Sequence, residues 1–505
     1  MKRKILFMGF NSLLSSLLFI GCGKGFLEQP PEANLTDKNY WQTESDIKQG
    51  VNGAYSSLRG LGTFSFWLFG EMRSDNTTFQ YNAPQRGQIN REEVDQFLVN
   101  SANTLLQDFW RDSYSSIFRC NDVLMHIDNV ALTEAVKNQS IGEVKFLRAY
   151  HYFNLVRQFG GVPLRIEATR SPESAGSEGR ASVEAIYQQI IADLNDAATN
   201  LPLASTYGSA DKGRISKGAA YALLGKVYLT LTRYEEALTA LRQVNGYTLL
   251  SNYGDIFKPE NKNNSESVFE IQYYATTGTN LSSNFMYWFA PFDSGNIVTQ
   301  DPTTNLNYNS GWNTPTQDII NAYESGDLRK DVSLAEGFTN STGFVAAPYV
   351  KKFNHGFVLP GQTNVNFPVI RYADVLLMIA ECLNEAGFVP EGEAFTLLNQ
   401  VRTRAGLPSK TSSNAITALR VDSQEAFRQA IAQERQIELA FENHRWYDLV
   451  RTKQAVTVMN AHGQREVAQN PSIFPNGAYR VTENKLLLPI PEREILLDNL
   501  EQNPM

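Results

Sequence analysis

Two stretches of the 505-residue chain combine aromatic side chains with amides, hydroxyls and glycines, at 64–81 and 273–312. The chain holds 29 Phe, 22 Tyr and 6 Trp residues, so flat ring surfaces are plentiful. Aromatic faces pack against the apolar faces of sugar rings, while amides and hydroxyls bond to the sugar hydroxyl groups. These stretches therefore predict a site for flat ligands with polar edges.

Trp288 and Trp312 are the foremost candidates for ring stacking, because their neighbours are amides, hydroxyls and glycines. A single aromatic residue in a long loop more often anchors the loop to the core than meets a ligand. The other tryptophans are expected in the core: Trp41, Trp67, Trp110 and Trp446. The predicted ligand-binding residues are Trp288, Trp312, Tyr287 and Tyr81 for stacking, with Asp75, Asn76 and Arg86 for bonds to hydroxyls.

Catalytic motifs are absent from the sequence, which has no G-x-S-x-G, G-x-x-x-x-G-K, H-E-x-x-H or C-x-x-C string. The five histidines are scattered, without metal-ligand spacing. Glu434, Glu438 and Glu442 stand four residues apart beside Arg435 and Arg445, and this spacing predicts a salt-bridge face on a helix. A carboxylate pair for glycoside hydrolysis stays possible, because such pairs meet only in the fold. We expect no enzymatic activity, no metal and no cofactor.

The N-terminus has the layout of a secretory signal peptide over residues 1–21. Three basic residues precede an apolar run at 5–20, which is shorter than the ~20 residues of a membrane-spanning helix. The run ends in Phe19-Ile20-Gly21-Cys22, which resembles the bacterial lipobox and predicts acylation of Cys22; the alternative is a chance cysteine. Several acyl chains make membrane residence effectively permanent. No acidic cluster follows Cys22, so the side of the membrane that the protein faces stays open.

Composition excludes two further classes of protein. The net charge of -8 and the pI near 5.4 argue against nucleic-acid binding, which favours a basic face. Besides Cys22 the chain has only Cys120 and Cys382, both in helical patterns, so we expect buried thiols and no disulfide framework.

Apolar spacing predicts a mostly α-helical fold with few short strands. The predicted helices are 44–59, 104–129, 138–159, 181–199, 215–231, 234–244, 372–386, 391–405 and 423–452. The predicted strands are 267–272 and 485–490, and 250–365 is expected to be largely irregular.

One helix pair carries a tetratricopeptide-like signature. Leu224-Gly225, Tyr228, Ala237 and Leu241 fit the spacing of that repeat. Gly225 and Ala237 are small, as two closely packed antiparallel helices require. The segment 379–401 repeats the pattern around Pro390. Chance matching remains the alternative for either pair alone, and two matches favour a helical repeat scaffold.

Eight segments, in the same order along the chain, resemble the SusD/RagB family of outer-membrane nutrient-binding lipoproteins. They are WQTESDIKQGVNGAYSSL (41–58), EMRSD (71–75), EVKFLRAYHYFNLV (143–156), RISKGAAYALLGKVYL (214–229), RYADVLLMIAE (371–381), VRTRAG (401–406), ERQIELAFENHRWYDLVR (434–451) and LPIP (488–491).

The resemblance implies one SusD-like domain over 22–505: an N-terminal part with helical repeats (22–245), a loop-rich ligand-face insert (246–370) and a C-terminal helical part (371–505). Family members cover a SusC-like TonB-dependent transporter and pass it oligosaccharides or, in some cases, peptides. The expected protein is a lipid-anchored glycan-binding partner of such a transporter, outside the cell. The alternatives are a peptide-binding member, an adaptor without ligand affinity and a lipid-anchored glycosidase.

Overall fold

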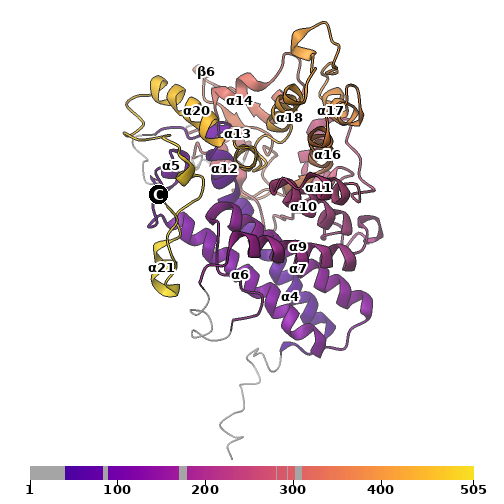
Figure 1. Ribbon diagram of the computed structural model, residues 1–505. Coiled ribbons are helices and arrows are strands. Elements are labelled where there is room, and N and C mark those ends of the chain that lie inside the picture. Colours follow the sequence, from indigo (N-terminus) through magenta and orange to yellow (C-terminus); the bar gives the residue numbers. More distant parts are fainter. Residues whose placement is uncertain are drawn as a thin grey trace, which may run out of the picture.

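The computed structural model describes residues 40–82, 89–169, 179–279, 281–292, 294–301 and 310–504. The predicted signal peptide, Cys22 and Arg86 lie outside these residues. The fold is mostly α-helical with few short strands, which confirms the predicted fold class (Figure 1). The predicted domain boundaries at 245 and 370 stay a prediction.

Within the described part of the chain, nine helices form one layer, in which each packs against the next along the chain and the last also packs on α16. They are α4 (Glu44–Gly60), α6 (Thr104–His126), α7 (Glu134–Phe159), α9 (Val183–Asn200), α10 (Lys217–Thr230), α11 (Tyr234–Leu241), α16 (Tyr372–Ala386), α17 (Glu393–Arg404) and α18 (Gln424–Glu438). Side chains at Thr43, Ser182 and Ser216 accept hydrogen bonds from backbone N–H groups of the first turn that follows, which fixes where three of these helices begin.

The predicted tetratricopeptide-like pairs are α10 with α11 and α16 with α17. At Gly225 an added Cβ would lie 2.5 Å from Cγ of Leu241, so only glycine allows α10 and α11 to approach this closely. Leu241 and Ala237 are fully buried between the two helices. The small residues therefore have the role that the sequence predicted.

The segment between α11 and α16 forms a loop-rich half of the fold, which lies above the N-terminal helices in Figure 1. It consists of short elements joined by loops and is as irregular as predicted. Its helices are α12 (Phe285–Phe289), α13 (Gly295–Thr299), α14 (Gln317–Ala322) and α15 (Lys330–Ser333). The strands of this half form two-stranded antiparallel sheets, one of which includes a strand from the N-terminal part of the chain. The pairs are β1 (Thr77–Thr78) with β3 (Thr314–Pro315), β2 (Ser267–Ile271) with β8 (Phe367–Arg371), β4 (Leu334–Ala335) with β7 (Tyr349–Val350), and β5 (Phe338–Asn340) with β6 (Gly343–Val345). The predicted strand at 267–272 is thus confirmed.

The remaining elements flank these two halves. They are α5 (Ile89–Asp95), α19 (Arg445–Arg451), α20 (Ala455–Gln469), α21 (Glu492–Asp498), π-helical Leu61–Ser65 and Trp67–Met72, and 3-10 turns at Ile127–Asn129, Ala204–Thr206, Tyr253–Phe257, Pro259–Asn261, Thr417–Leu419 and Glu483–Lys485. Among the described residues, no helix has both the length and the apolar character that crossing a bilayer requires.

Two predicted elements are wrong. The helix at 423–452 is two helices, α18 and α19, because Phe441 and Asn443 adopt left-handed backbone angles (φ 68° and 67°) between them. The predicted strand at 485–490 is the end of a 3-10 turn, a bend and an irregular segment without a strand partner. Pro489 and Pro491 remove backbone donors there, and the N–H of Leu488 donates to the carbonyl of Gln158 instead.

The predicted salt-bridge face on a helix is also wrong. Glu434, Glu438 and Glu442 are buried, and Glu442 lies beyond the end of α18. Their partners come from other segments: Arg329 with Asp327, Glu434 and Glu438; Arg371 with Glu266, Glu438 and Glu442; Arg402 with Glu324 and Glu434; Arg404 with Glu266 and Glu438; Lys352 with Glu442. This buried network joins the loop-rich half to the helical layer.

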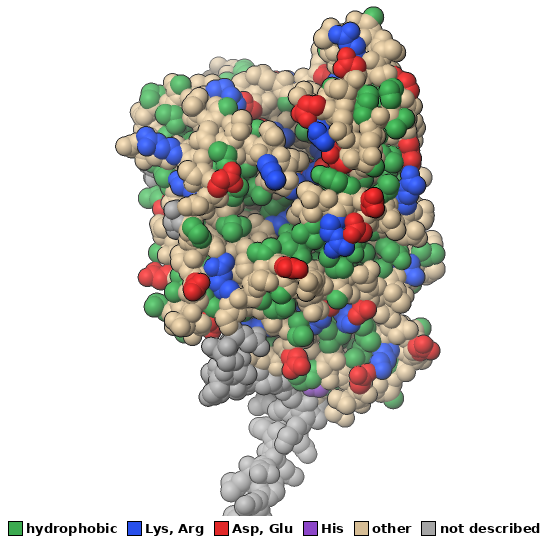
Figure 2. All heavy atoms as spheres, viewed as in Figure 1, with side chains coloured by type: hydrophobic (Ala, Val, Ile, Leu, Met, Phe, Trp, Pro, Cys, Tyr) green, Lys and Arg blue, Asp and Glu red, His purple; other side chains and the backbone are tan. Residues whose placement is uncertain are grey.

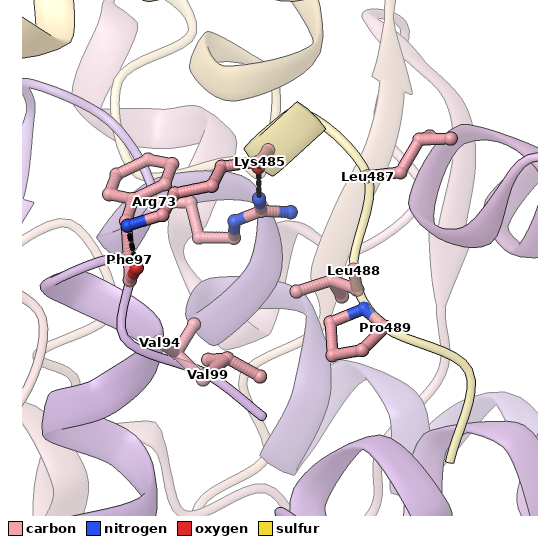
Figure 3. A pocket seen from close by; sticks show the side chains of 8 residues that line it. All are labelled: Arg73, Val94, Phe97, Val99, Lys485, Leu487, Leu488 and Pro489. Atoms are coloured by element: carbon pink, nitrogen blue, oxygen red, sulfur yellow. Dashed lines mark hydrogen bonds between the residues drawn. The ribbon is translucent and has the colours of Figure 1, made fainter. Parts of the chain in front are cut away.

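The C-terminal segment returns to the N-terminal half. Arg73 donates to the carbonyl of Lys485 at 2.7 Å, and the Lys485 ammonium donates to the carbonyl of Phe97 at 2.9 Å (Figure 3). These residues and the apolar side chains of Val94, Val99 and Leu487 to Pro489 line a cavity of about 30 Å³. That volume holds about one water molecule, so the cavity is a packing defect and not a ligand site.

Candidate ligand-binding surface

The residues after α4 form π-helical segments, which are rare and frequently lie at functional sites. This winding turns Phe64 outward, where its side chain is 48% exposed, and turns Trp67 into the core. Trp67 is held there by donating its indole N–H to the carbonyl of Thr63 at 2.8 Å. The predicted core position of Trp67 is confirmed, as are those of Trp41, Trp110 and Trp446.

Trp288 lies on α12 as a half-buried ring beside this segment. Phe64 meets it edge-on with ring centres 5.8 Å apart, and Trp67 lies 6.3 Å away toward the core. The Arg91 guanidinium lies 4.5 Å from the Trp288 ring centre, and burial lowers the pKa of Arg91 to about 10. Phe64 and Trp288 therefore form an aromatic cluster, and the Arg91 guanidinium lies over the Trp288 ring.

Trp312 lies behind this surface. The backbone at 310–312 is bonded to α12, with Trp312 N donating to the carbonyl of Trp288 at 2.8 Å. The Trp312 side chain is 5% exposed, and its ring packs on Phe79 at 5.7 Å between ring centres. The two tryptophans predicted for ring stacking, Trp288 and Trp312, are therefore neighbours. The role that the structure shows for Trp312 is to support α12, and its contact with a ligand stays a prediction.

Tyr287 is half-buried next to Trp288, and its hydroxyl donates to Oδ2 of Asp301 at 2.7 Å. The same carboxylate oxygen accepts the N–H of Gly361 at 3.1 Å. At Gly361 (φ +70°) a Cβ would lie 2.5 Å from the Tyr287 ring, so glycine lets that loop close over the ring. The orientation of Tyr287 is thus fixed from two sides.

Asp75 and Asn76 do not lie on this surface. Arg445 donates two hydrogen bonds of 2.8 Å to the Asp75 carboxylate, which is 6% exposed as a residue. The Asn76 amide donates to Glu71 at 3.1 Å and accepts from Gln436 at 2.9 Å. Both side chains connect the N-terminal half to α18 and α19. The predicted bonds from Asp75 and Asn76 to a ligand remain untested, and the observed partners give both residues a structural role.

Tyr81 is half-buried and packs against the core. Sequence reasoning did not select Phe64 or Arg91, which the structure places against Trp288. Phe64 begins an aromatic run in which only the π-helical winding decides which ring faces out. Arg91 lies on α5, a helix of seven residues that the periodicity did not reveal.

The described residues hold no group of three or more His, Cys, Asp or Glu side chains placed to bind a metal ion. Cys120 and Cys382 are buried, and burial raises the pKa of each thiol to about 12. These thiols are protonated at neutral pH and are not nucleophiles.

Two comparisons cover most of the chain. Residues 330–505 match the family described as "SusD family", and residues 25–229 match "Starch-binding associating with outer membrane". A solved structure titled "Laminarin binding SusD-like protein" is 30% identical, with a TM-score of 0.76, over 92% of this chain and 99% of that one. The chain belongs to the SusD family.

Other relatives agree with this assignment. The chain is 27% identical to SusD-like protein P38 of Formosa agariphila, with 97% of each covered. It is 25% identical to a SusD homolog from Bacteroides thetaiotaomicron, with a TM-score of 0.78 over 94% of this chain and all of that one. SusD-like proteins are binding proteins of a non-catalytic family and are associated with the outer membrane. The expectation that this chain is not an enzyme is therefore confirmed.

Proposed function

We propose that this SusD family member captures glycan chains at the outer membrane and delivers them to a SusC-like TonB-dependent transporter. The observation that carries the proposal is the half-buried Trp288 ring beside the exposed Phe64 ring, with the Arg91 guanidinium 4.5 Å from the Trp288 centre. A sugar ring would stack on these aromatic faces while its hydroxyls bond to nearby polar groups. The laminarin-binding relative supports a glycan as the ligand.

Binding to the signal-free protein tests this proposal. Laminarin, starch and a glycan array are one arm, and a peptide library is the other. Trp288→Ala should weaken glycan binding at least ~10-fold, since loss of a central aromatic contact costs ~2 kcal/mol or more. The matched control is Phe344→Ala, which removes a 66% exposed ring on β6 and should leave affinity unchanged. Unchanged binding in Trp288→Ala would contradict the proposal, and binding to peptides alone would favour the peptide-binding alternative.

The lipid anchor and the transporter need tests of their own. Intact-mass measurement of membrane-extracted protein should show acyl chains on Cys22 and their loss in Cys22→Ala, with the variant released from the membrane fraction. Co-purification with a TonB-dependent transporter would support delivery. Normal glycan uptake by cells that carry Trp288→Ala would favour an adaptor that binds no ligand itself.

A further inference from the structure

A second cavity, of about 200 Å³, opens between α4, the loop at 210–214 and β2. Its apolar floor is lined by the half-buried ring of Tyr55 and by Leu58 and Ile271, which are only 1% and 2% exposed. The volume is below the ~300–1,000 Å³ typical of pockets for drug-sized ligands, so it suits a single small ring. None of the predicted ligand-binding residues lines it.

Arg59, on the last turn of α4, places a half-buried guanidinium at this cavity. Among the described residues it takes part in no ion pair and no side-chain hydrogen bond, and burial lowers its pKa. Removing part of a guanidinium from water costs free energy when no partner replaces the lost hydrogen bonds, and a bound anion would supply such a partner. Lys212, exposed on the facing loop, adds a second cation without an ion pair within the described residues.

The other charged side chains around the cavity already have ion-pair or hydrogen-bond partners. Arg214 donates to Glu143 at 3.1 Å and to Asp211 at 2.9 Å, which leaves these carboxylates occupied. Glu270 is buried, accepts the amide N–H of Asn366 at 2.9 Å, and has its pKa raised by burial. Among the described residues that line the cavity, Arg59 and Lys212 are the cations that take part in no ion pair.

The loop that carries Lys212 is fixed against β2. Gly213 adopts φ +101°, and an added Cβ would lie 2.8 Å from the Asn263 amide and 2.9 Å from the Gln272 amide. The Tyr55 hydroxyl accepts the N–H of Ile215 at 2.9 Å, which holds the other end of the loop on α4. The cavity thus has rigid walls, as a preformed binding site requires.

We propose that this cavity is a second binding site, for one acidic sugar residue whose carboxylate pairs with Arg59 and Lys212 while its ring packs against Tyr55. Guanidinium groups bind carboxylates through two parallel hydrogen bonds, and the apolar floor takes the ring face that a simple anion lacks. The choice of a sugar among small carboxylates rests on the proposed glycan-binding function. An acidic side chain of a protein partner is the competing occupant.

Calorimetric titration of the signal-free protein with D-glucuronate, D-glucose, inorganic sulfate and a short glutamyl peptide tests the proposal. Glucuronate should bind in the millimolar range, at least ~10-fold more tightly than glucose, and Arg59→Gln should remove that difference. Lys212→Gln should weaken binding only a few-fold because Lys212 is exposed. The control, Arg233→Gln, removes an exposed arginine of the Arg233–Glu236 pair and should bind glucuronate normally.

Several outcomes would overturn the second site. If glucose bound as tightly as glucuronate, or if Arg59→Gln still bound glucuronate, the cation would have no role in binding. Sulfate that binds as tightly as glucuronate reduces the cavity to a general anion site, and a peptide that binds more tightly assigns it to a protein partner. Arg59→Gln should leave neutral glycan binding intact and Trp288→Ala should leave glucuronate binding intact, so failure of one site is distinguishable from failure of the other.

Discussion

The Asp75 carboxylate is held by two hydrogen bonds of 2.8 Å from Arg445, and both side chains are nearly buried. Asp75→Asn preserves the shape of the side chain but leaves Arg445 with an unpaired charge. Removing one partner of a buried ion pair typically costs ~3–5 kcal/mol. We expect the free energy of unfolding of this variant, measured by urea denaturation, to fall by ~2–4 kcal/mol.

Asp128 provides the matched control, since it pairs with Lys137 on the surface and its side chain is 73% exposed. Surface pairs contribute ~0–1 kcal/mol, so Asp128→Asn should change stability little. If the Asp75→Asn protein were as stable as the wild type but bound glycan poorly, the structural role of Asp75 would be wrong and the predicted ligand contact right.

At the scale of elements, two glycines in helix interiors make opposite predictions. Gly225→Ala places a methyl group 2.5 Å from Cγ of the buried Leu241, so α10 and α11 must separate or Leu241 must leave its position. Overpacking of this kind costs ~1–3 kcal/mol, more than the helix propensity that alanine gains. The melting temperature of Gly225→Ala should fall, by ~1–2 °C for ~1–2 kcal/mol in a domain of this size.

Gly53 in α4 is the control because no atom lies within 4 Å of an added Cβ. Gly53→Ala should raise stability by ~0.5–1 kcal/mol, through the lower entropy of the unfolded chain. A stabilised Gly225→Ala protein would show that the α10–α11 contact is looser than the structure has it.

The elements also show how far the sequence predicts this fold. Apolar periodicity located the helices of the main layer because their buried faces repeat every three to four residues. It could not show that Glu434 and Glu438 face arginines from distant segments, because a stripe of acids on a helix looks the same in water and in a buried network. The short helix α5 and the whole of α20 were missed. In these two segments, packing against distant residues determines the helix more than the local apolar pattern does.

The candidate ligand-binding surface was predictable only in part, because contacts between distant segments decide which of its rings are exposed. Composition pointed to the segment that holds Trp288, and the chain places that ring at the surface. The sequence could not separate Trp288 from Trp312, since both have small polar neighbours, and only the bonds between 310–312 and α12 put Trp312 behind it. Phe64 depends on π-helical winding, for which no sequence signal was found.

For the molecule as a whole, the C-terminal segment closes the fold on the N-terminal half, where α20 lies near α5 (Figure 1). Figure 2 shows acidic and basic side chains interspersed over the face in view, so no charge of one sign dominates it. One closing contact is titratable. Asp95, at the end of α5, is fully buried and accepts hydrogen bonds from Tyr479 and Thr78.

Burial raises the pKa of Asp95 to about 8, although the hydrogen bond from Tyr479 and the charge of His462 act in the opposite direction. His462 and Glu466 on α20 face this group. Burial alone would lower the pKa of His462, but its hydrogen bond with Asp318 and the carboxylates of Glu466 and Asp95 raise it. Both raised pKa values mean that the folded state holds protons that the unfolded chain releases, so stability falls as pH rises.

Asp95→Asn removes the titrating carboxyl group and tests how the C-terminal segment is held against the N-terminal half. The unfolded aspartate loses its proton near pH ~4, and the folded group keeps it until pH is about 8. Between these values the wild type should lose stability relative to Asp95→Asn, by at most ~1.4 kcal/mol per pH unit, with parallel profiles outside the window. Urea denaturation at each pH from 4 to 9 measures the difference. Tyr479→Phe is the control, because it keeps the carboxyl and removes a hydrogen bond that lowers the pKa of Asp95. Its stability should therefore fall with pH as that of the wild type does. If the wild type and Asp95→Asn gave parallel profiles at every pH, Asp95 would be ionised in the folded protein and the C-terminal segment would close without its proton.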